Sequence, residues 1–73
     1  MRPFQKLFIE MYHQKMDVLD LAHKAGVDQK TCFNHLTGKR DIEPEYLLKY
    51  CSVLDIDPSW FYKYFNQIEP NKE

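Results

Sequence analysis

The chain lacks the features of a membrane protein, a nucleotide-binding protein or an unspecific nucleic-acid binder. No apolar run approaches the roughly 20 residues of a transmembrane helix, and no apolar block of a signal peptide follows the first residues. Glycine occurs only twice, so no glycine-rich phosphate loop is present. The net charge of −1 argues against a strongly basic protein that binds any nucleic acid. These absences predict a small cytoplasmic domain without a membrane partner.

Cysteine is also scarce. Cys32 and Cys51 each lie inside a helical pattern, so we expect two buried free thiols in a reducing compartment. Cys32 and His35 are three residues apart, but no second pair supplies the four ligands of a structural zinc site. The chain is also too short for a pocket around a catalytic Cys–His pair. We therefore expect no metal, no cofactor and no enzymatic activity.

Charge is distributed unevenly along the chain. Residues 1–40 carry seven Lys or Arg against four Asp or Glu, a net charge of +3. Residues 41–73 carry three against seven, a net charge of −4. One end of the molecule could face phosphates while the other repels them, or the acidic half could dock a protein. The charges alone do not decide between these interpretations.

Apolar spacing predicts helices and no strand. The first helix is expected over about residues 3–15, with one apolar face made of Phe4, Leu7, Phe8, Met11 and Tyr12. A second helix is expected over about 17–25 and a third over about 28–37, each with an Asp at its start and a Gly at its end. Together they form the pattern of a helix-turn-helix.

Proline marks the start of two further helices. Pro44 opens a fourth helix, whose predicted buried stripe is Leu47, Leu48, Cys51 and Leu54. Asp57 and Pro58 open a fifth, with an apolar face of Trp60, Phe61, Tyr64 and Phe65. We therefore predict a single all-α domain of five helices over residues 1–67, followed by a polar tail over 68–73. The predicted core is Phe4, Leu7, Phe8, Leu21, Ala22, Val27, Leu36, Leu47, Leu54 and Phe61.

With these helices placed, the chain resembles the Cro/repressor class of helix-turn-helix regulators, the XRE family with a lambda-repressor-like fold. The resemblance covers roughly residues 5–62 and rests on Leu21-Ala22, Gly26-Val27, Gln29, Thr31, Leu36, Gly38-Lys39-Arg40, Leu47-Leu48-Lys49, Leu54 and Asp57-Pro58-Ser59-Trp60-Phe61. It implies that the third helix enters the major groove of DNA. The expected contact residues are Gln29, Lys30, Phe33, Asn34, Thr37, Lys39 and Arg40.

A helical wheel distributes roles among these residues. At about 100° per residue, Cys32 and Leu36 point inward, and Lys30, Asn34 and Thr37 point outward. Gln29 and Phe33 lie on the flank. Gln29 and Asn34 can pair with adenine, Lys30 can reach guanine or a phosphate, and Phe33 can pack on a thymine methyl group. Lys39 and Arg40 suit phosphate contacts. His23, Lys24 and His35 are expected to add to the positive field.

The sequence is compatible with two functions. The first is a small phage-type transcriptional regulator that binds double-stranded operator DNA, as a homodimer if it reads a palindrome. The second is an antirepressor or modulator that binds a phage repressor through the same surface, because an exposed aromatic such as Phe33 is typical of protein interfaces. In either case Trp60, Tyr62 and Phe65 are predicted to contact a second copy or a partner.

Overall fold

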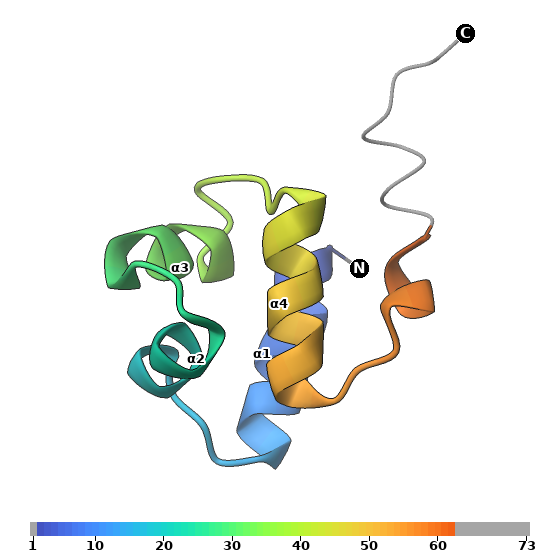
Figure 1. Cartoon of the computed structure of the whole chain (residues 1–73), viewed down its shortest axis with the longest axis horizontal. Coiled ribbons are helices and arrows are strands. Elements are labelled where there is room, and N and C mark those ends of the chain that lie inside the picture. The colour runs from blue at the N-terminus through green and yellow to red at the C-terminus, as the bar shows by residue number, and fades with distance from the viewer. Residues whose placement is uncertain (1, 63–73) are drawn as a thin grey trace, which may run out of the picture.

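The computed structural model describes residues 2–62, which form four α-helices and one 3-10 turn (Figure 1). The elements are α1 (Pro3–His13), α2 (Val18–Ala25), α3 (Gln29–Leu36), α4 (Pro44–Leu54) and η1 (Pro58–Phe61). No strand occurs within this part of the chain, so the prediction of an all-α fold is confirmed. None of its helices is long and apolar enough to cross a membrane.

The residues that flank α2 and α3 fix the ends of both helices as the sequence predicts. Asp17 precedes α2, and its carboxylate accepts a hydrogen bond from the Asp20 backbone N–H at 2.9 Å. Gly26 ends α2 with a φ of 70°, a left-handed conformation that costs little only for glycine. Asp28 precedes α3 and accepts from the N–H groups of Lys30 and Thr31 at 3.1 and 3.3 Å.

The second glycine brings the end of α3 against the start of α1. Gly38 has a φ of 80°, and a Cβ atom placed on it would lie 3.1 Å from two carbons of the Phe4 ring. Glycine therefore suits the position through its backbone conformation, and a Cβ here would also require the Phe4 ring to shift by a few tenths of an ångström. Because Phe4 belongs to the first turn of α1, this contact positions α3 relative to the N-terminal helix.

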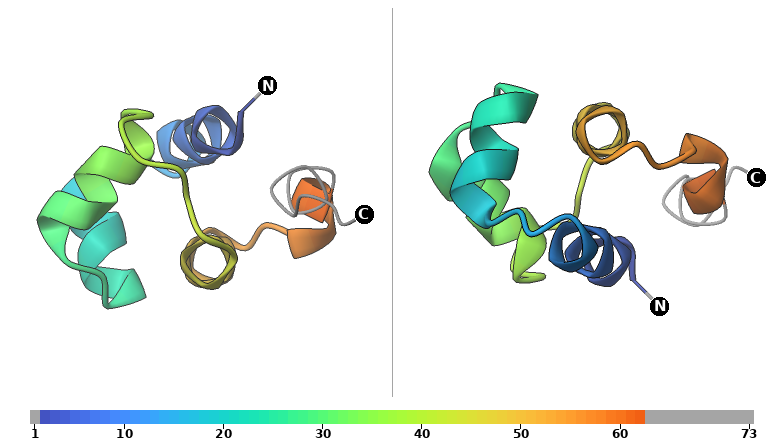
Figure 2. Two further views of the ribbon diagram at one scale, coloured as in Figure 1. Left: turned by 90° about the horizontal axis from the view of Figure 1, so that it is seen from above. Right: turned by 90° about the horizontal axis from the view of Figure 1, so that it is seen from below.

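The helices pack around one core, with the helix-turn-helix at one side. α1 and α4 lie beside each other, α2 and α3 cover one side of this pair, and η1 lies on the other side of α4 (Figures 1 and 2). The buried apolar side chains come from all five elements and from the loops: Leu7, Met11, Leu21, Ala22, Val27, Cys32, Leu36, Ile42, Leu47, Tyr50, Cys51, Leu54, Ile56 and Phe61.

The predicted apolar face of α1 is too wide. Leu7 and Met11 are buried and Phe4 packs partly against the core, but Phe8 is 42% exposed and Tyr12 is 83% exposed. The helix also ends at His13 rather than at residue 15. In the two turns after Phe4, α1 buries one side chain per turn, Leu7 and then Met11, whereas the prediction had two per turn. Phe8 and Tyr12 lie on the flank of this buried stripe, which is exposed to solvent. The placement of Phe8 in the core was wrong.

A similar correction applies to α4. Leu48 is 48% exposed, whereas Tyr50, absent from the predicted stripe, is completely buried. The buried set Leu47, Tyr50, Cys51 and Leu54 follows the i, i+3, i+4, i+7 rule of one helix face, and Leu48 stands about 100° away from Leu47. The predicted fifth helix begins as the 3-10 turn η1, and Tyr64 and Phe65 lie outside the described residues.

Candidate nucleic-acid interface

The outward face of α3 carries most of the predicted contact residues. Gln29, Lys30 and Thr37 are exposed, Asn34 is half-buried, and Phe33 leaves 46% of its surface in solvent. Cys32 and Leu36, on the opposite face, are completely buried. The structure therefore brings the five outward side chains together on one surface of the helix-turn-helix.

The two cations after α3 differ in their surroundings. Lys39 is exposed, and its ammonium lies 5.7 Å from the centre of the Phe33 ring. Arg40 instead donates to the Glu43 carboxylate at 2.7 Å. This ion pair raises the pKa of the Arg40 guanidinium and lowers the pKa of the Glu43 carboxyl. The positive charge of Arg40 is thus partly neutralised within the protein, whereas that of Lys39 is available to a ligand.

His35 does not contribute to the positive surface as expected, because it is completely buried. Its ring lies between α3 and α4, where Nδ1 is 2.8 Å from the Tyr50 hydroxyl and Nε2 is 3.3 Å from the Glu43 carboxylate. Burial lowers the pKa of His35, so the ring is neutral near pH 7. The prediction for His35 was wrong because its exposure depends on a partner in another helix.

The contacts of His35 determine which ring nitrogen holds the proton. A carboxylate only accepts, so the Nε2–H group donates to Glu43 and Nδ1 accepts from the Tyr50 hydroxyl. Burial also raises the pKa of Tyr50 and of the neighbouring Cys32 thiol, which keeps both groups protonated. This network fixes the inner face of α3 to α4, so the outer face is held on a rigid support.

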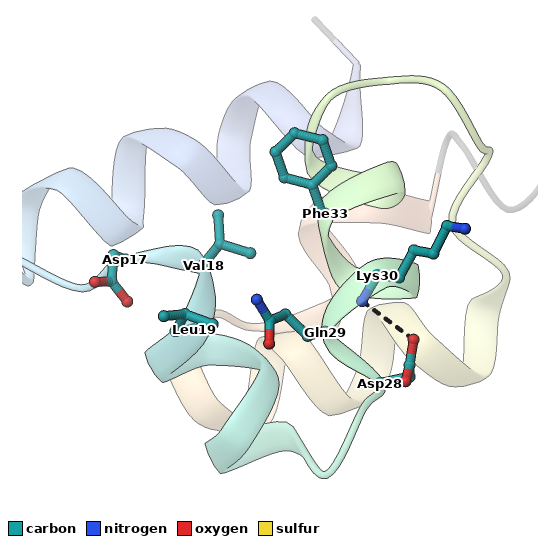
Figure 3. Close-up of a pocket in the computed structure, with 7 residues that line it drawn as sticks. All are labelled: Asp17, Val18, Leu19, Asp28, Gln29, Lys30 and Phe33. Carbon is teal, nitrogen blue, oxygen red and sulfur yellow. Dashed lines mark hydrogen bonds between the residues drawn. The ribbon is translucent and has the colours of Figure 1, made fainter.

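A groove runs between the start of α2 and the outward face of α3. It encloses about 670 Å³ and is lined by Asp17, Val18, Leu19, Asp28, Gln29, Lys30 and Phe33. Figure 3 shows Asp17 at one end of the groove and Asp28 at the other, with Leu19 and Gln29 between them. The Lys30 ammonium points away from the Asp17 end.

Leu19 is an exposed residue of this surface that the sequence pattern did not single out. It is 54% exposed and lines both this groove and a neighbouring hollow of about 490 Å³ that extends to His23 and Lys24. A wheel of α2 places Leu19 about 160° from the buried Leu21, so its exposure had a signal in the sequence. That Leu19 and Phe33 line the same groove had no such signal, because the two residues belong to different helices.

The aromatic residues near the C-terminal end of the described chain form a separate surface. Trp60 is 50% exposed and Tyr62 is 58% exposed, whereas Phe65 lies outside the described residues. The Lys6 ammonium lies 4.5 Å from the centre of the Trp60 ring and 3.1 Å from the Glu10 carboxylate. Since η1 lies across α4 from α2 and α3, this surface does not adjoin the groove (Figures 1 and 2).

The sequence of the chain matches the model of a known protein family. A model described as helix-turn-helix matches residues 11–61, which include the end of α1 and all of α2, α3, α4 and η1. The chain therefore belongs to the helix-turn-helix family of the Cro/repressor type, whose domains are DNA-binding domains of transcriptional regulators and not enzymes. Comparison with curated proteins and with solved structures gives no significant match.

Proposed function

We propose that the protein is a small phage-type transcriptional regulator that binds operator DNA through α3. The observation that carries this proposal is the pair of exposed hydrogen-bonding side chains in the first turn of α3, Gln29 and Lys30, on a domain of a DNA-binding family. The N-terminal residues of a recognition helix are the ones that contact base edges in this class of domain.

Each side chain on this face has a distinct task in the proposal. The carboxamides of Gln29 and Asn34 pair with adenine, and the Lys30 ammonium reaches guanine or a phosphate. Phe33 packs on a thymine methyl group. Lys39, at the end of α3, contacts a phosphate and contributes to affinity for any sequence.

A titration with DNA from the region upstream of the gene tests this proposal. Asn34→Ala is expected to cost about 1–3 kcal/mol at one operator position. Lys39→Gln is expected to weaken binding to all sequences alike and to reduce the slope of log K against log salt by about 1. Lys49→Gln removes the same charge from an exposed position on α4, outside both the outward face of α3 and the Trp60 surface, and is the matched control. Operator binding that is unchanged in both α3-face variants would contradict the proposal.

The proposal includes a homodimer, because a regulator of this class reads two half-sites that are about one helical turn apart. The exposed ring of Trp60 supplies apolar surface for a contact between copies, on the side away from α3. Sedimentation with and without operator DNA is the measurement. A strict monomer in both conditions would eliminate the dimer and weaken the operator-binding proposal.

A second candidate function is a modulator that binds a partner repressor through the same face. The exposure of Phe33 favours it, because a large apolar side chain at the centre of a surface is typical of a protein contact. In this case Phe33→Ala is expected to weaken the complex by about 2 kcal/mol or more. Specific operator binding that survives Phe33→Ala would eliminate this candidate.

A further inference from the structure

Both helices of the helix-turn-helix begin at a carboxylate. The N-terminus of a helix attracts anions, and its free N–H groups make it a common site for a phosphate. Here the Asp17 carboxylate accepts from the Asp20 N–H, and the Asp28 carboxylate accepts from the N–H groups of Lys30 and Thr31. The two positions that would attract phosphate therefore carry negative charge instead.

The groove between these carboxylates is apolar. Leu19 and Phe33 leave 54% and 46% of their surfaces exposed, and the half-buried Val18 lies between Asp17 and Leu19 in the lining. The Lys30 ammonium points away from the Asp17 end, so it does not neutralise both carboxylates (Figure 3). A DNA backbone is a poor occupant for such a groove, because it presents phosphates and little apolar surface.

The carboxylates also retain hydrogen-bonding capacity. Among residues 2–62, the second oxygen of Asp17 (Oδ2) and that of Asp28 (Oδ1) accept no hydrogen bond from the protein. Each can therefore receive a guanidinium or ammonium group. The charge and the apolar lining together define a complementary ligand, which has cationic groups spaced around one or two apolar side chains.

We propose that the groove formed by the start of α2 and the face of α3 binds a basic segment of a partner protein. Lysine or arginine side chains of that segment pair with Asp17 and Asp28, and an apolar side chain packs between Leu19 and Phe33. Because the groove includes Gln29 and Lys30, its occupant competes with operator DNA. The inference rests on the proposed function in one respect, that the groove shares the α3 face with the proposed DNA site. A partner protein bound in the groove would thereby control DNA binding.

Selection from a displayed library of random peptides, with the full chain as bait, provides a probe. We expect enriched peptides to carry lysine or arginine around an apolar residue, and to be lost when Phe33→Ser is the bait. A synthetic copy of one enriched peptide, carrying a fluorophore, then gives the affinity from anisotropy. No enrichment of basic sequences, or equal enrichment on Phe33→Ser, would overturn the proposal.

The charge contribution is tested with Asp17→Asn and Asp28→Asn, because asparagine caps a helix about as well as aspartate. Each substitution is expected to lower the affinity for the peptide by about threefold or more. Each is also expected to strengthen binding to a short duplex of random sequence at low salt, by about twofold. Glu10→Gln removes one negative charge beside Lys6 and is expected to change neither affinity.

The outcomes separate this inference from the proposed function. Operator binding by the unsubstituted chain without selection of basic peptides rejects the groove proposal and leaves the proposed function in place. Selection of basic peptides without operator binding supports the groove proposal and rejects the proposed function. Peptide affinities that are unchanged in both Asp→Asn variants reject the role of the carboxylates. If either variant loses its helical circular dichroism, the Asp→Ser substitution at that position preserves a cap without the charge.

Discussion

The contact between His35 and Tyr50 allows a direct test of how the recognition helix is supported. Tyr50→Phe removes one hydroxyl and keeps the ring that fills the core. In the folded protein that hydroxyl donates to His35 Nδ1 at 2.8 Å, at a site where both side chains have no exposed surface. The substitution therefore leaves a buried acceptor without a donor, and water has no access to replace it.

The magnitude follows from this burial. A buried polar group that loses its partner costs about 1–3 kcal/mol. In a domain of this size, 1 kcal/mol shifts Tm by about 4–8 °C, so Tyr50→Phe is expected to lower Tm by about 4–24 °C. The free energy of unfolding is expected to fall by about 1–3 kcal/mol in urea titrations followed by circular dichroism, with an unchanged slope.

A double-mutant cycle identifies the cause of the loss. His35→Leu removes the acceptor, so the Tyr50→Phe change in a His35→Leu background no longer leaves Nδ1 unpaired. We expect the second substitution to cost less than about 0.5 kcal/mol in that background. Additive effects of the two substitutions, or a Tyr50→Phe variant as stable as the original chain, would refute the assigned network.

Three further predictions concern stability. Leu47→Ala removes a buried side chain from the centre of α4 and is expected to cost about 2–5 kcal/mol in urea unfolding. Gly38→Ala is expected to lose more stability than Gly26→Ala. Both glycines have a positive φ that costs about 1–2 kcal/mol for alanine, but only at Gly38 does the new Cβ meet the Phe4 ring, at 3.1 Å; equal losses would contradict the contact. The lowered pKa of His35 means that the unfolded chain binds the proton more readily, so its contribution to stability is complete above about pH 6.5 and is lost as the pH falls below that value. A midpoint of urea unfolding that rises on acidification from pH 7 to 5 would contradict the sign of this shift.

The helix ends were predictable because each depends on a short stretch of chain. Asp17, Gly26 and Asp28 act on backbone groups within four residues, and their effect does not depend on the rest of the fold. The exposure of Leu48 was not predictable in the same way. Two leucines in succession both fit a broad stripe, and the neighbouring elements decide which of them is covered.

The candidate site likewise has features that the sequence predicts and features that depend on how the helices pack. The outward direction of Lys30 and the inward direction of Cys32 follow from the helical period alone. The burial of His35 does not, because the hydroxyl that satisfies it lies 15 residues later in the chain. The groove was likewise missed, since Leu19 and Phe33 line one groove only when α2 and α3 are packed together.

The position of the single tryptophan decides which optical signals this protein offers. Trp60 contacts Lys6 from α1 on the side of α4 opposite to α2 and α3, and half of its surface is in water. Its fluorescence therefore reports whether the contact between Trp60 and Lys6 is kept, and a ligand in the groove lies outside its immediate surroundings. A change in tryptophan emission on addition of DNA would indicate association between copies or movement of η1. Occupancy of the helix-turn-helix itself needs a dye on the ligand.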